Sequence, residues 1–539
     1  MEVREIDALT FRKMFVTGAR CLEIQKNYIN DLNVFPVPDG DTGTNMSLTI
    51  TTAAETVSNL ENPSVEEVAK AISSGSLRGA RGNSGVILSQ LFRGFYKGLK
   101  DQTSLTAPII SAAMTKATET AYKAVMKPKE GTILTVAKAL SDRAAELCYN
   151  EMPLGDFMEA ILAAGDSTLA RTPEMLPVLK EAGVVDAGGQ GLMTILHGAV
   201  DAFYGREPEE VHVEMAEAVS YPYKAEIVVI TDAVMSDRER QVLSNLLDTV
   251  GDEVEIAVGG TCVRVSMVTD EPGIVIEKLM TVGELAASRV RNMTIPEGAA
   301  AFAVDEAEAP VKEEKAKEPA KPYAFIAVAS GDGMAEIFAN CGVEKVIKGG
   351  QTMNPSTEDF LNAIEEVNAE VVYILPNNKN IILAASQAAD LSKDCRVAVI
   401  PTKTIPQGLT AVINYVPDRS VEENVAAMTE EIGRVKTGQV TYAVRDTSID
   451  GKEIHVGDMM GINDDGIAAV GQDIKAVCLD MLKAMVDEDA ELISIYNGED
   501  LSSEDAEELQ GMVEEAFPDC DVELNYGGQA VYYCIVSVE

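Results

Sequence analysis

Apolar residues in the first two hundred positions recur at helical spacings. Phe11, Met14 and Phe15 begin one such series, and it continues to Leu32 at intervals of three, four or seven residues. Further helical patterns open at Ser64, run from Val86 to Leu99, and return around Leu140 and Leu196. We therefore predict an all-α N-terminal domain, arranged as a helical barrel, over residues 1–206.

Four glycine-rich breaks separate these predicted helices. They are the segments Asn33–Asn45, Gly79–Gly85, Pro128–Ile133 and Val184–Gly191. Glycine at a helix start exposes unpaired backbone N–H groups, which are natural sites for anions and phosphates. One break would be weak grounds for a site, because glycine also ends helices. Four of them predict a nucleotide site at one end of the barrel.

The first break carries the strongest chemical signal. Asp39 and Asp41 flank Gly40, and Pro36 and Pro38 restrict the backbone just before them. Carboxylates and carboxamides on a tight loop suit Mg²⁺, which binds nucleotide phosphates through one or two carboxylates. The competing interpretation is an ordinary surface turn, since Asp and Gly are common turn residues.

The rest of the chain changes character twice. Residues 207–304 mix strand patterns (224–230, 253–258, 262–268) with helical ones (237–250, 273–279), which predicts a small α+β middle domain. Residues 305–322 are almost all Asp, Glu, Lys, Pro and Ala, a composition typical of a flexible linker. From 323 to 539, strand candidates at 323–329, 345–348, 370–375 and 396–400 alternate with helices, which predicts an α/β domain with a parallel sheet. The expected architecture is therefore multidomain.

The composition of the chain limits which binding partners and which cellular compartment we expect. The formal charge is −43, from 87 acidic and 44 basic residues, so nucleic acid and acidic lipid are not expected to bind. This charge either serves solubility alone or favours a basic protein partner. No apolar run reaches 18 residues, the first residues lack the basic and apolar regions typical of a signal peptide, and eight cysteines are scattered. We expect a cytoplasmic protein without an integral membrane segment.

The segment Asn33–Asn45 resembles the metal-binding loop of the DhaL-like family, the ATP-binding fold of dihydroxyacetone kinases. Three polar segments after strand candidates, 349–357, 375–381 and 401–408, extend the likeness to the C-terminal region. Together they resemble the catalytic component of bacterial fatty acid kinases, in which a DhaL-like kinase domain is joined to a DegV-like C-terminal region.

The resemblance implies a reaction and a site. A separate fatty-acid-binding protein of the DegV family would present a carboxylate, which would receive the γ-phosphoryl group of ATP to give an acyl phosphate. Two Mg²⁺ ions would be held by Asp39 and Asp41, with Asn33 as a further, weaker metal ligand. The matching phosphate and nucleotide positions would be Arg81, which would neutralise charge, together with Asn45, Gly82, Ser84, Gly85 and Thr132. A fatty acid carboxylate is ionised at neutral pH and needs no general base.

The middle domain departs from the family pattern. Relatives often carry a cysteine and a His-x-His there, whereas this chain has Lys224, Ser266 and Val268 at the corresponding positions. Without thiolate or imidazole ligands no zinc site is expected. We expect a structural domain, with a homodimer contact as one role.

Two other functions stay open. One is a small-molecule kinase of the dihydroxyacetone (glycerone) type, although the chain lacks a region like the carbonyl-binding component of those enzymes. The other is an adaptor without catalysis that binds nucleotide and protein. ATP turnover separates the adaptor from both kinases.

Overall fold

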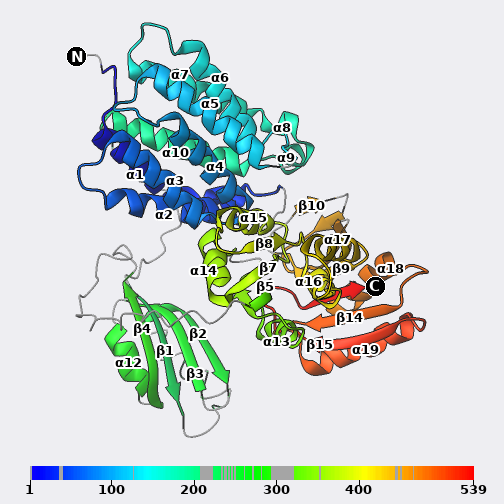
Figure 1. The fold of residues 1–539 in the computed structure, drawn as a ribbon. Helices are drawn as coiled ribbons and strands as arrows, with labels where there is room; N and C mark the ends of the chain where they lie inside the picture. Colours follow the sequence, from blue (N-terminus) through cyan, green and yellow to red (C-terminus); the bar gives the residue numbers. More distant parts are fainter. Residues whose placement is uncertain are drawn as a thin grey trace. The chain divides into compact units, whose positions relative to one another are not determined.

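The fold of the chain is shown by a computed structural model (Figure 1). The structure describes residues 3–35, 40–125, 127–206, 223–231, 235, 240, 243, 247, 250–259, 262–269, 272–280, 282–292 and 321–539, the last range without 351–353, 444–446, 450, 451 and 465. Within these residues no helix is long and apolar enough to cross a membrane. The predicted linker lies outside the described residues except for its last two positions.

The N-terminal part is all helical, as predicted. Its helices are α1 (Ala8–Asp31), α2 (Thr42–Ser58), α3 (Val65–Gly79), α4 (Gly82–Gly98), α5 (Ala107–Ala124), α6 (Ile133–Leu147), α7 (Leu154–Ala170), α8 (Thr172–Met175), α9 (Pro177–Ala182) and α10 (Ala187–Phe203). We call them the helical domain. Its core includes the fully buried Leu22, Ile29 and Phe157.

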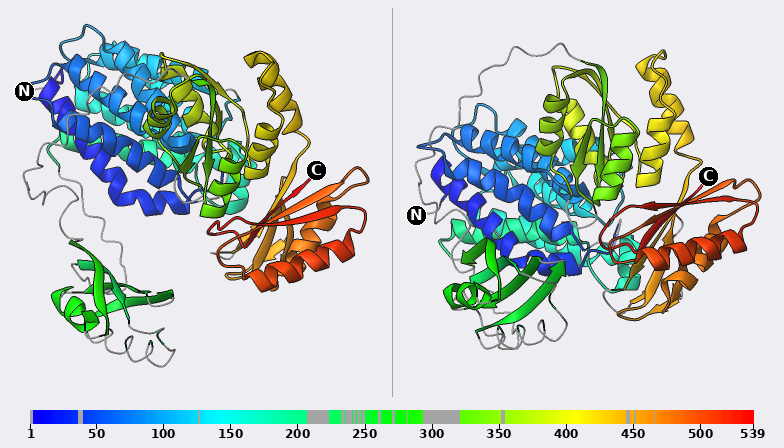
Figure 2. Two further views of the ribbon diagram at one scale, coloured as in Figure 1. Left: turned by 60° about the horizontal axis from the view of Figure 1, so that its bottom comes forward. Right: turned by 90° about the horizontal axis from the view of Figure 1, so that it is seen from below.

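Local sequence sets where these helices begin. Ser64 forms a capping box with Glu67 at the start of α3, because each side chain accepts the other residue's backbone N–H. Asp7 caps α1 by accepting from the Thr10 N–H at 2.8 Å. The chain then folds so that α1 packs against α2 and α10, and α4 against α3 and α5 (Figures 1 and 2).

The middle part contains an antiparallel sheet of four described strands in the order β2-β3-β1-β4. They are β1 (Tyr223–Ile230), β2 (Gly251–Gly259), β3 (Cys262–Thr269) and β4 (Glu284–Asn292), accompanied by α12 (Pro272–Met280). The first three strands and α12 were predicted, whereas β4 was not. Most of the predicted helix 237–250 lies outside the described residues. Lys224 pairs with Val268 across β1 and β3, so the register places two of the three positions noted in the sequence opposite each other.

The C-terminal part begins with a parallel sheet, as predicted, and its strands lie in the order β6-β5-β7-β8. Its strands are β5 (Lys321–Ala329), β6 (Lys345–Lys348), β7 (Ala369–Leu375) and β8 (Arg396–Val399), and its helices are α13 (Asp332–Asn340), α14 (Thr357–Val367), α15 (Ile382–Leu391), α16 (Ile405–Ile413) and α17 (Val421–Glu431). Lys321 and Pro322 were assigned to the linker, which is wrong. Lys321 donates its N–H to the Asn368 carbonyl at 2.9 Å, and Pro322 sits near the strand start, where a missing N–H is tolerated.

A second, mixed sheet follows and was not predicted. It has the order β13-β12-β9-β16-β14-β15 and is built from β9 (Lys436–Tyr442), β12 (Met459–Asn463), β13 (Gly466–Gly471), β14 (Leu492–Asn497), β15 (Asp521–Tyr526) and β16 (Cys534–Val538). The short strands β10 (Thr447–Ile449) and β11 (Lys452–Ile454) pair with each other. The helices α18 (Ile474–Met485) and α19 (Ser503–Ala516) complete this part. We call β5 to β16 the C-terminal α/β region.

The chain divides into two compact units. Residues 1–210 and 317–539 form one, and residues 211–316 form the other. Within the first unit, Ala80 and Val86 of the helical domain are buried in the same apolar cluster as Phe360 and Ala384 of the C-terminal α/β region. We call the contact of the α3–α4 segment with α14 and α15 the inter-domain seam (Figure 2).

One buried glutamine, Gln387, makes several hydrogen bonds at this seam. Gln387 donates to the Leu77 carbonyl at 2.8 Å and to the Thr357 hydroxyl at 3.2 Å, and its own carbonyl accepts from Gln90 at 2.8 Å. Gln90, Thr357 and Gln387 are all buried, so a lost partner is not readily replaced by solvent.

Gln387→Ala is therefore expected to weaken the seam, because an unsatisfied buried polar group costs about 1–3 kcal/mol. We expect the amides of residues 77–90 to exchange hydrogen faster by about an order of magnitude or more, as measured by mass spectrometry on the full chain. Gln510→Ala, on α19 away from the seam, is the matched control. Wild-type protection of residues 77–90 in Gln387→Ala would contradict this role.

Candidate functional site

The first turns of α2, α4, α6 and α10 come together within the helical domain. A Cβ atom placed at Gly191 of α10 would lie 2.8 Å from the Met46 sulfur of α2, so glycine allows these two helices to touch. The Asp186 carboxylate joins α10 to α6, because it accepts the N–H groups of Gly189 and Ile133. Helix N-termini carry partial positive charge and unpaired N–H groups. These helix starts lie at the breaks that the sequence marked, and groups of this kind can bind an anion.

The contact between α2 and α4 depends on Gly82. Its φ is +56°, a left-handed conformation that side chains disfavour. A Cβ atom there would also lie 2.5 Å from the Asn45 amide nitrogen. Gly82 thus lets the start of α4 approach Asn45, which is 4% exposed. Gly85 lies one turn further on, over Thr49 of α2.

The loop before α2 brings several predicted residues into one place. Asp41 is the N-cap residue of α2, yet its side chain makes no capping hydrogen bond with the helix. Asn33, which is 2% exposed, accepts a hydrogen bond from the Thr42 hydroxyl. That hydroxyl also lies 3.5 Å from the Ser84 hydroxyl at the start of α4. Asp39 lies outside the described residues.

A residue from the C-terminal α/β region completes this cluster. Asn354 donates its amide to the Asp41 carboxylate at 2.6 Å and lies 3.4 Å from the Asn45 side-chain oxygen. Arg81 donates to the Asn354 backbone carbonyl at 2.8 Å and lies 3.7 Å from the Asp359 carboxylate. The candidate site is therefore formed at the inter-domain seam, and Arg81 holds the loop that delivers Asn354.

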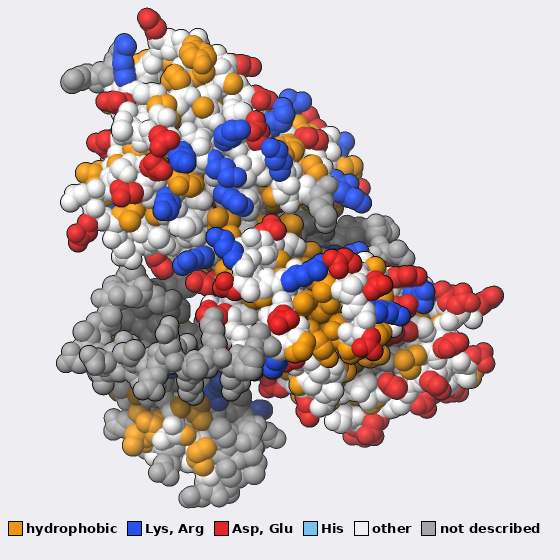
Figure 3. Space-filling model, in the orientation of Figure 1, with side chains coloured by type: hydrophobic (Ala, Val, Ile, Leu, Met, Phe, Trp, Pro, Cys, Tyr) orange, Lys and Arg blue, Asp and Glu red, His pale blue; other side chains and the backbone are white. Residues whose placement is uncertain are grey.

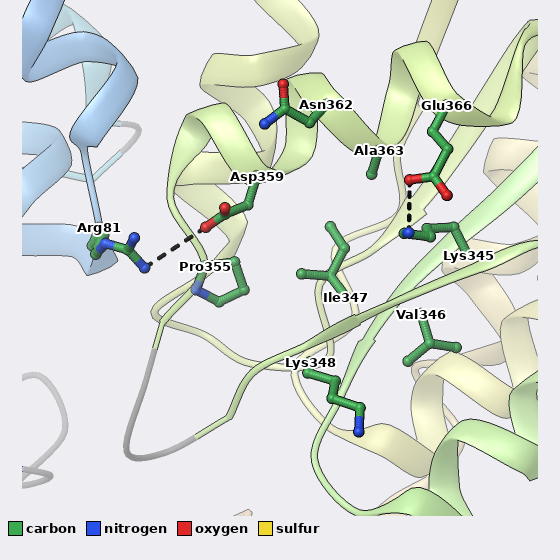
Figure 4. Close-up of a pocket in the computed structure, with 10 residues that line it drawn as sticks. All are labelled: Arg81, Lys345, Val346, Ile347, Lys348, Pro355, Asp359, Asn362, Ala363 and Glu366. Atoms are coloured by element: carbon green, nitrogen blue, oxygen red, sulfur yellow. Dashed lines mark ion pairs between the residues drawn. The ribbon is translucent and has the colours of Figure 1, made fainter. Parts of the chain in front are cut away.

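A pocket of about 460 Å³ adjoins Arg81 (Figure 4). One side is formed by the Arg81–Asp359 pair and another by the Lys345–Glu366 pair, whose charged atoms are 2.6 Å apart. The arginine and this lysine are thus each matched by a nearby carboxylate. The pocket opens beside the candidate site and not within it, because neither Asp41 nor Asn45 lines it.

Thr132 and Asp186 occupy the far side of the helix-start cluster. Thr132 is the N-cap residue of α6, but its hydroxyl donates to the Lys129 carbonyl at 2.8 Å and does not cap the helix. Asp186 is 5% exposed. Burial raises the pKa of the Asp186 carboxyl to about 6, while the hydrogen bonds from the Gly189 and Ile133 N–H groups act in the opposite direction.

The donor atoms around Asp41 suit a hard cation. They are one carboxylate and the carboxamide oxygens of Asn33 and Asn45, the ligand types that Mg²⁺ prefers. The Asn354 side-chain oxygen is buried and has no hydrogen-bond partner among the described residues, so it could accept from a bound water. No group of three or more His, Cys, Asp or Glu side chains that could hold a metal occurs among the described residues, which do not include Asp39.

The structure brings together most of the predicted site residues that it describes. Asn33, Asp41, Asn45, Arg81, Gly82, Ser84 and Gly85 lie around one junction, and Thr132 lies at a helix start joined to it through α10. Sequence reasoning missed Thr42, Asp186 and Asn354. The first two lie inside breaks already singled out. Asn354 lies in the polar segment 349–357, but its target is 313 positions away, and no local pattern could supply that pairing.

Two family models match the chain. One, for the C-terminal part of FakA-like fatty acid kinases, covers residues 324–539, and a DAK2 domain model covers residues 36–201. Protein YloV of Bacillus subtilis is 40% identical over 559 residues, spanning all of both chains, and an uncharacterized protein of Staphylococcus aureus is 38% identical over 557 residues, again end to end. The chain belongs to the FakA-like fatty acid kinase family. The resemblance stated from the sequence is thereby confirmed.

Likeness to solved structures is weaker than likeness to this family. A DegV family protein from Corynebacterium glutamicum is 16% identical, with a TM-score of 0.32, over 41% of this chain and 97% of that one. At that score the match carries no argument about the site. The site assignment in this member of the FakA-like family therefore depends on its own residues.

Asp186 makes the stability of the helical domain depend on pH. Its carboxyl has a folded-state pKa raised from 3.8 to about 6, so ionisation costs more in the folded state than in the unfolded state. The wild-type chain should lose up to about 3 kcal/mol relative to Asp186→Asn as pH rises from 4 to 6, and nothing further above that. Thermal unfolding of both chains at pH 4.5 and 7.5 measures this, with the exposed Asp142→Asn as control. A difference between wild type and Asp186→Asn that does not change with pH would contradict it.

Proposed function

We propose that this chain transfers the γ-phosphoryl group of ATP to the carboxylate of a fatty acid, which a separate fatty-acid-binding protein of the DegV family presents. The product is an acyl phosphate. The main support is the joint presence of two features: end-to-end membership of the FakA-like fatty acid kinase family, and the cluster of Asp41, Asn33 and Asn45 where four helix starts meet.

Some residues of the site would bind metal, and others would bind phosphate and nucleotide. Asp41 and Asp39 would hold two Mg²⁺ ions, with Asn33 as a neutral ligand, and bound Mg²⁺ would neutralise the phosphate oxygens. The backbone around Gly82 and Gly85, together with Asn45, Ser84 and Thr132, would bind phosphate and nucleotide at the helix starts. Arg81 would add a fixed positive charge beside them.

The chemical step needs little beyond this positioning. One oxygen of the fatty acid carboxylate forms a bond to the γ-phosphorus, and the bond from that phosphorus to the β–γ bridging oxygen breaks, so that ADP leaves. The acceptor is ionised at neutral pH, and therefore no side chain has to remove a proton. Orientation of the two reacting oxygens and neutralisation of the phosphates are what the protein must supply.

The partner must approach an unusual surface. Lys and Arg side chains gather over the visible face of the helical domain, whereas Asp and Glu cover the end of the C-terminal α/β region around α19 (Figure 3). A carrier that delivers its lipid to the helix-start cluster would pass basic and acidic areas of this chain. Complementary charge on the carrier would speed the encounter more than it would tighten the complex.

Asp41→Ala is expected to lower acyl phosphate formation by at least about 100-fold, the loss typical of removing one precisely placed electrostatic group. The full chain would be incubated with ATP, Mg²⁺ and a fatty-acid-loaded carrier, and the acyl phosphate would be trapped with hydroxylamine. Asp142→Ala, an exposed aspartate on α6, should behave as wild type.

The same assay separates the alternatives. A small-molecule kinase would consume ATP with dihydroxyacetone and form no hydroxamate from the lipid, and an adaptor would consume no ATP with either acceptor. Wild-type turnover in Asp41→Ala would refute the metal assignment.

A further inference from the structure

The inter-domain seam contains an unusual number of carboxamides. Asn83 donates to Asn380 at 2.9 Å and Gln90 donates to Gln387 at 2.8 Å, so two amide pairs join the helical domain to the C-terminal α/β region. Asn354 differs from both of these pairs. Its amide crosses the same seam, but it donates to the carboxylate of Asp41 at 2.6 Å and, at 3.4 Å, to the side-chain oxygen of Asn45.

The backbone on the C-terminal side of Asn354 is fixed by the helical domain. Arg81 donates to the Asn354 carbonyl at 2.8 Å, and the Thr357 N–H donates to the Ala80 carbonyl at 3.1 Å. Ser356 lies between these contacts and forms a capping box with Asp359 at the start of α14. The loop is thus held at successive points, and the Asn354 side chain has little freedom to turn away.

The Asn354 amide has a defined orientation and one unused atom. The side chain is 3% exposed, and its nitrogen lies 2.6 Å from one Asp41 oxygen. Its oxygen is buried without a hydrogen-bond partner among the described residues. Buried polar atoms are nearly always satisfied in folded proteins, so an orphaned acceptor beside a carboxylate points to a missing donor such as metal-bound water.

We propose that Asn354 is a positioning residue of the cation and nucleotide site, and that the C-terminal α/β region thereby completes this site. This inference rests on the proposed function. A carboxylate that binds a metal is commonly oriented by a hydrogen bond to its other atoms, and loss of such a partner typically weakens metal binding 10- to 100-fold. Asn354 makes that bond to Asp41 from a region more than 300 positions away in sequence.

Holding the helical domain and the C-terminal α/β region together does not by itself explain the contact between Asn354 and Asp41. The Asn83–Asn380 pair joins the two parts without touching Asp41. A bond to Asp41 also engages one of its carboxylate oxygens, and so constrains the direction from which a cation can approach. Asn380→Ala therefore serves as the comparison, because it removes an amide hydrogen bond from the seam without touching Asp41 or Asn45, whereas Asn354→Ala removes the bonds to both.

The test is a Mg²⁺ titration of nucleotide binding, without fatty acid or carrier. The full-length wild type, Asn354→Ala, Asn354→Asp and Asn380→Ala are each titrated with Mg²⁺ in the presence of a fluorescent, non-hydrolysable ATP analogue. Asn354→Ala should raise the Mg²⁺ midpoint about 10- to 100-fold. Asn354→Asp should raise it at least as much, because it places a second carboxylate against Asp41. Asn380→Ala should stay near wild type.

Two other patterns of Mg²⁺ midpoints would overturn the proposal. Equal shifts in Asn354→Ala and Asn380→Ala would make Asn354 a structural contact only. A lower midpoint in Asn354→Asp would make position 354 a direct metal ligand. Recovery of full analogue binding by Asn354→Ala at saturating Mg²⁺ shows that the variant is folded, and failure to recover counts against a positioning role. This binding test contains no acyl acceptor and is therefore independent of the transfer reaction. If the separate assay with a fatty-acid-loaded carrier gave no acyl phosphate, the proposed function would be refuted and the binding result would still stand.

Discussion

The structure of the candidate site depends on one electrostatic constraint, the meeting of four helix starts. Each helix N-terminus carries about half a unit of positive charge, so their convergence is unfavourable unless negative charge lies among them. Asp186 lies between α6 and α10, and Asp41 lies at the start of α2. Their negative charge offsets part of the repulsion, but burial raises the pKa of Asp186 and so weakens its contribution. The remainder favours an anion. The same constraint explains the glycines, because Gly82 and Gly191 remove the side chains that would keep the helices apart.

The inter-domain seam is held together by interactions of a different kind from those at the helix starts. The chain as a whole carries a formal charge of −43, so contacts between like charges would be unfavourable in a seam. Besides the Arg81–Asp359 pair, the seam uses neutral carboxamides, with Gln387 bound by groups from α3, α4 and α14, and apolar contacts around Val86. Neutral amides bind each other without regard to net charge. They cost free energy when left unpaired, which makes the seam specific as well as cohesive.

Local patterns predicted much of this molecule. Helical periodicity identified the helical domain, capping boxes such as Ser64 with Glu67 located helix starts, and strand alternation found the parallel sheet nearly residue for residue. The glycine-rich breaks marked the helix starts that meet. The mixed sheet and its strand order were not predictable, because pairings such as β9 with β16 join segments nearly one hundred residues apart. The contact between Asn354 and Asp41 could not be predicted from the sequence for the same reason. The predicted role of Asp39 stays a prediction, because this residue lies outside the described residues.

Arg81 shows how one side chain can serve both the seam and the site. Sequence reasoning assigned it to phosphate charge, whereas the structure places one of its N–H groups on the Asn354 carbonyl. The guanidinium has five N–H donors in a fixed plane, and its side chain is 24% exposed. The same guanidinium lies 3.7 Å from the Asp359 carboxylate, so Arg81 joins the Asn354 backbone to the first turn of α14. Because Arg81 is also the N-cap residue of α4, it connects the loop that contacts Asp41 to the helix start where phosphate would bind, and both parts of the proposed site therefore depend on the same closed seam.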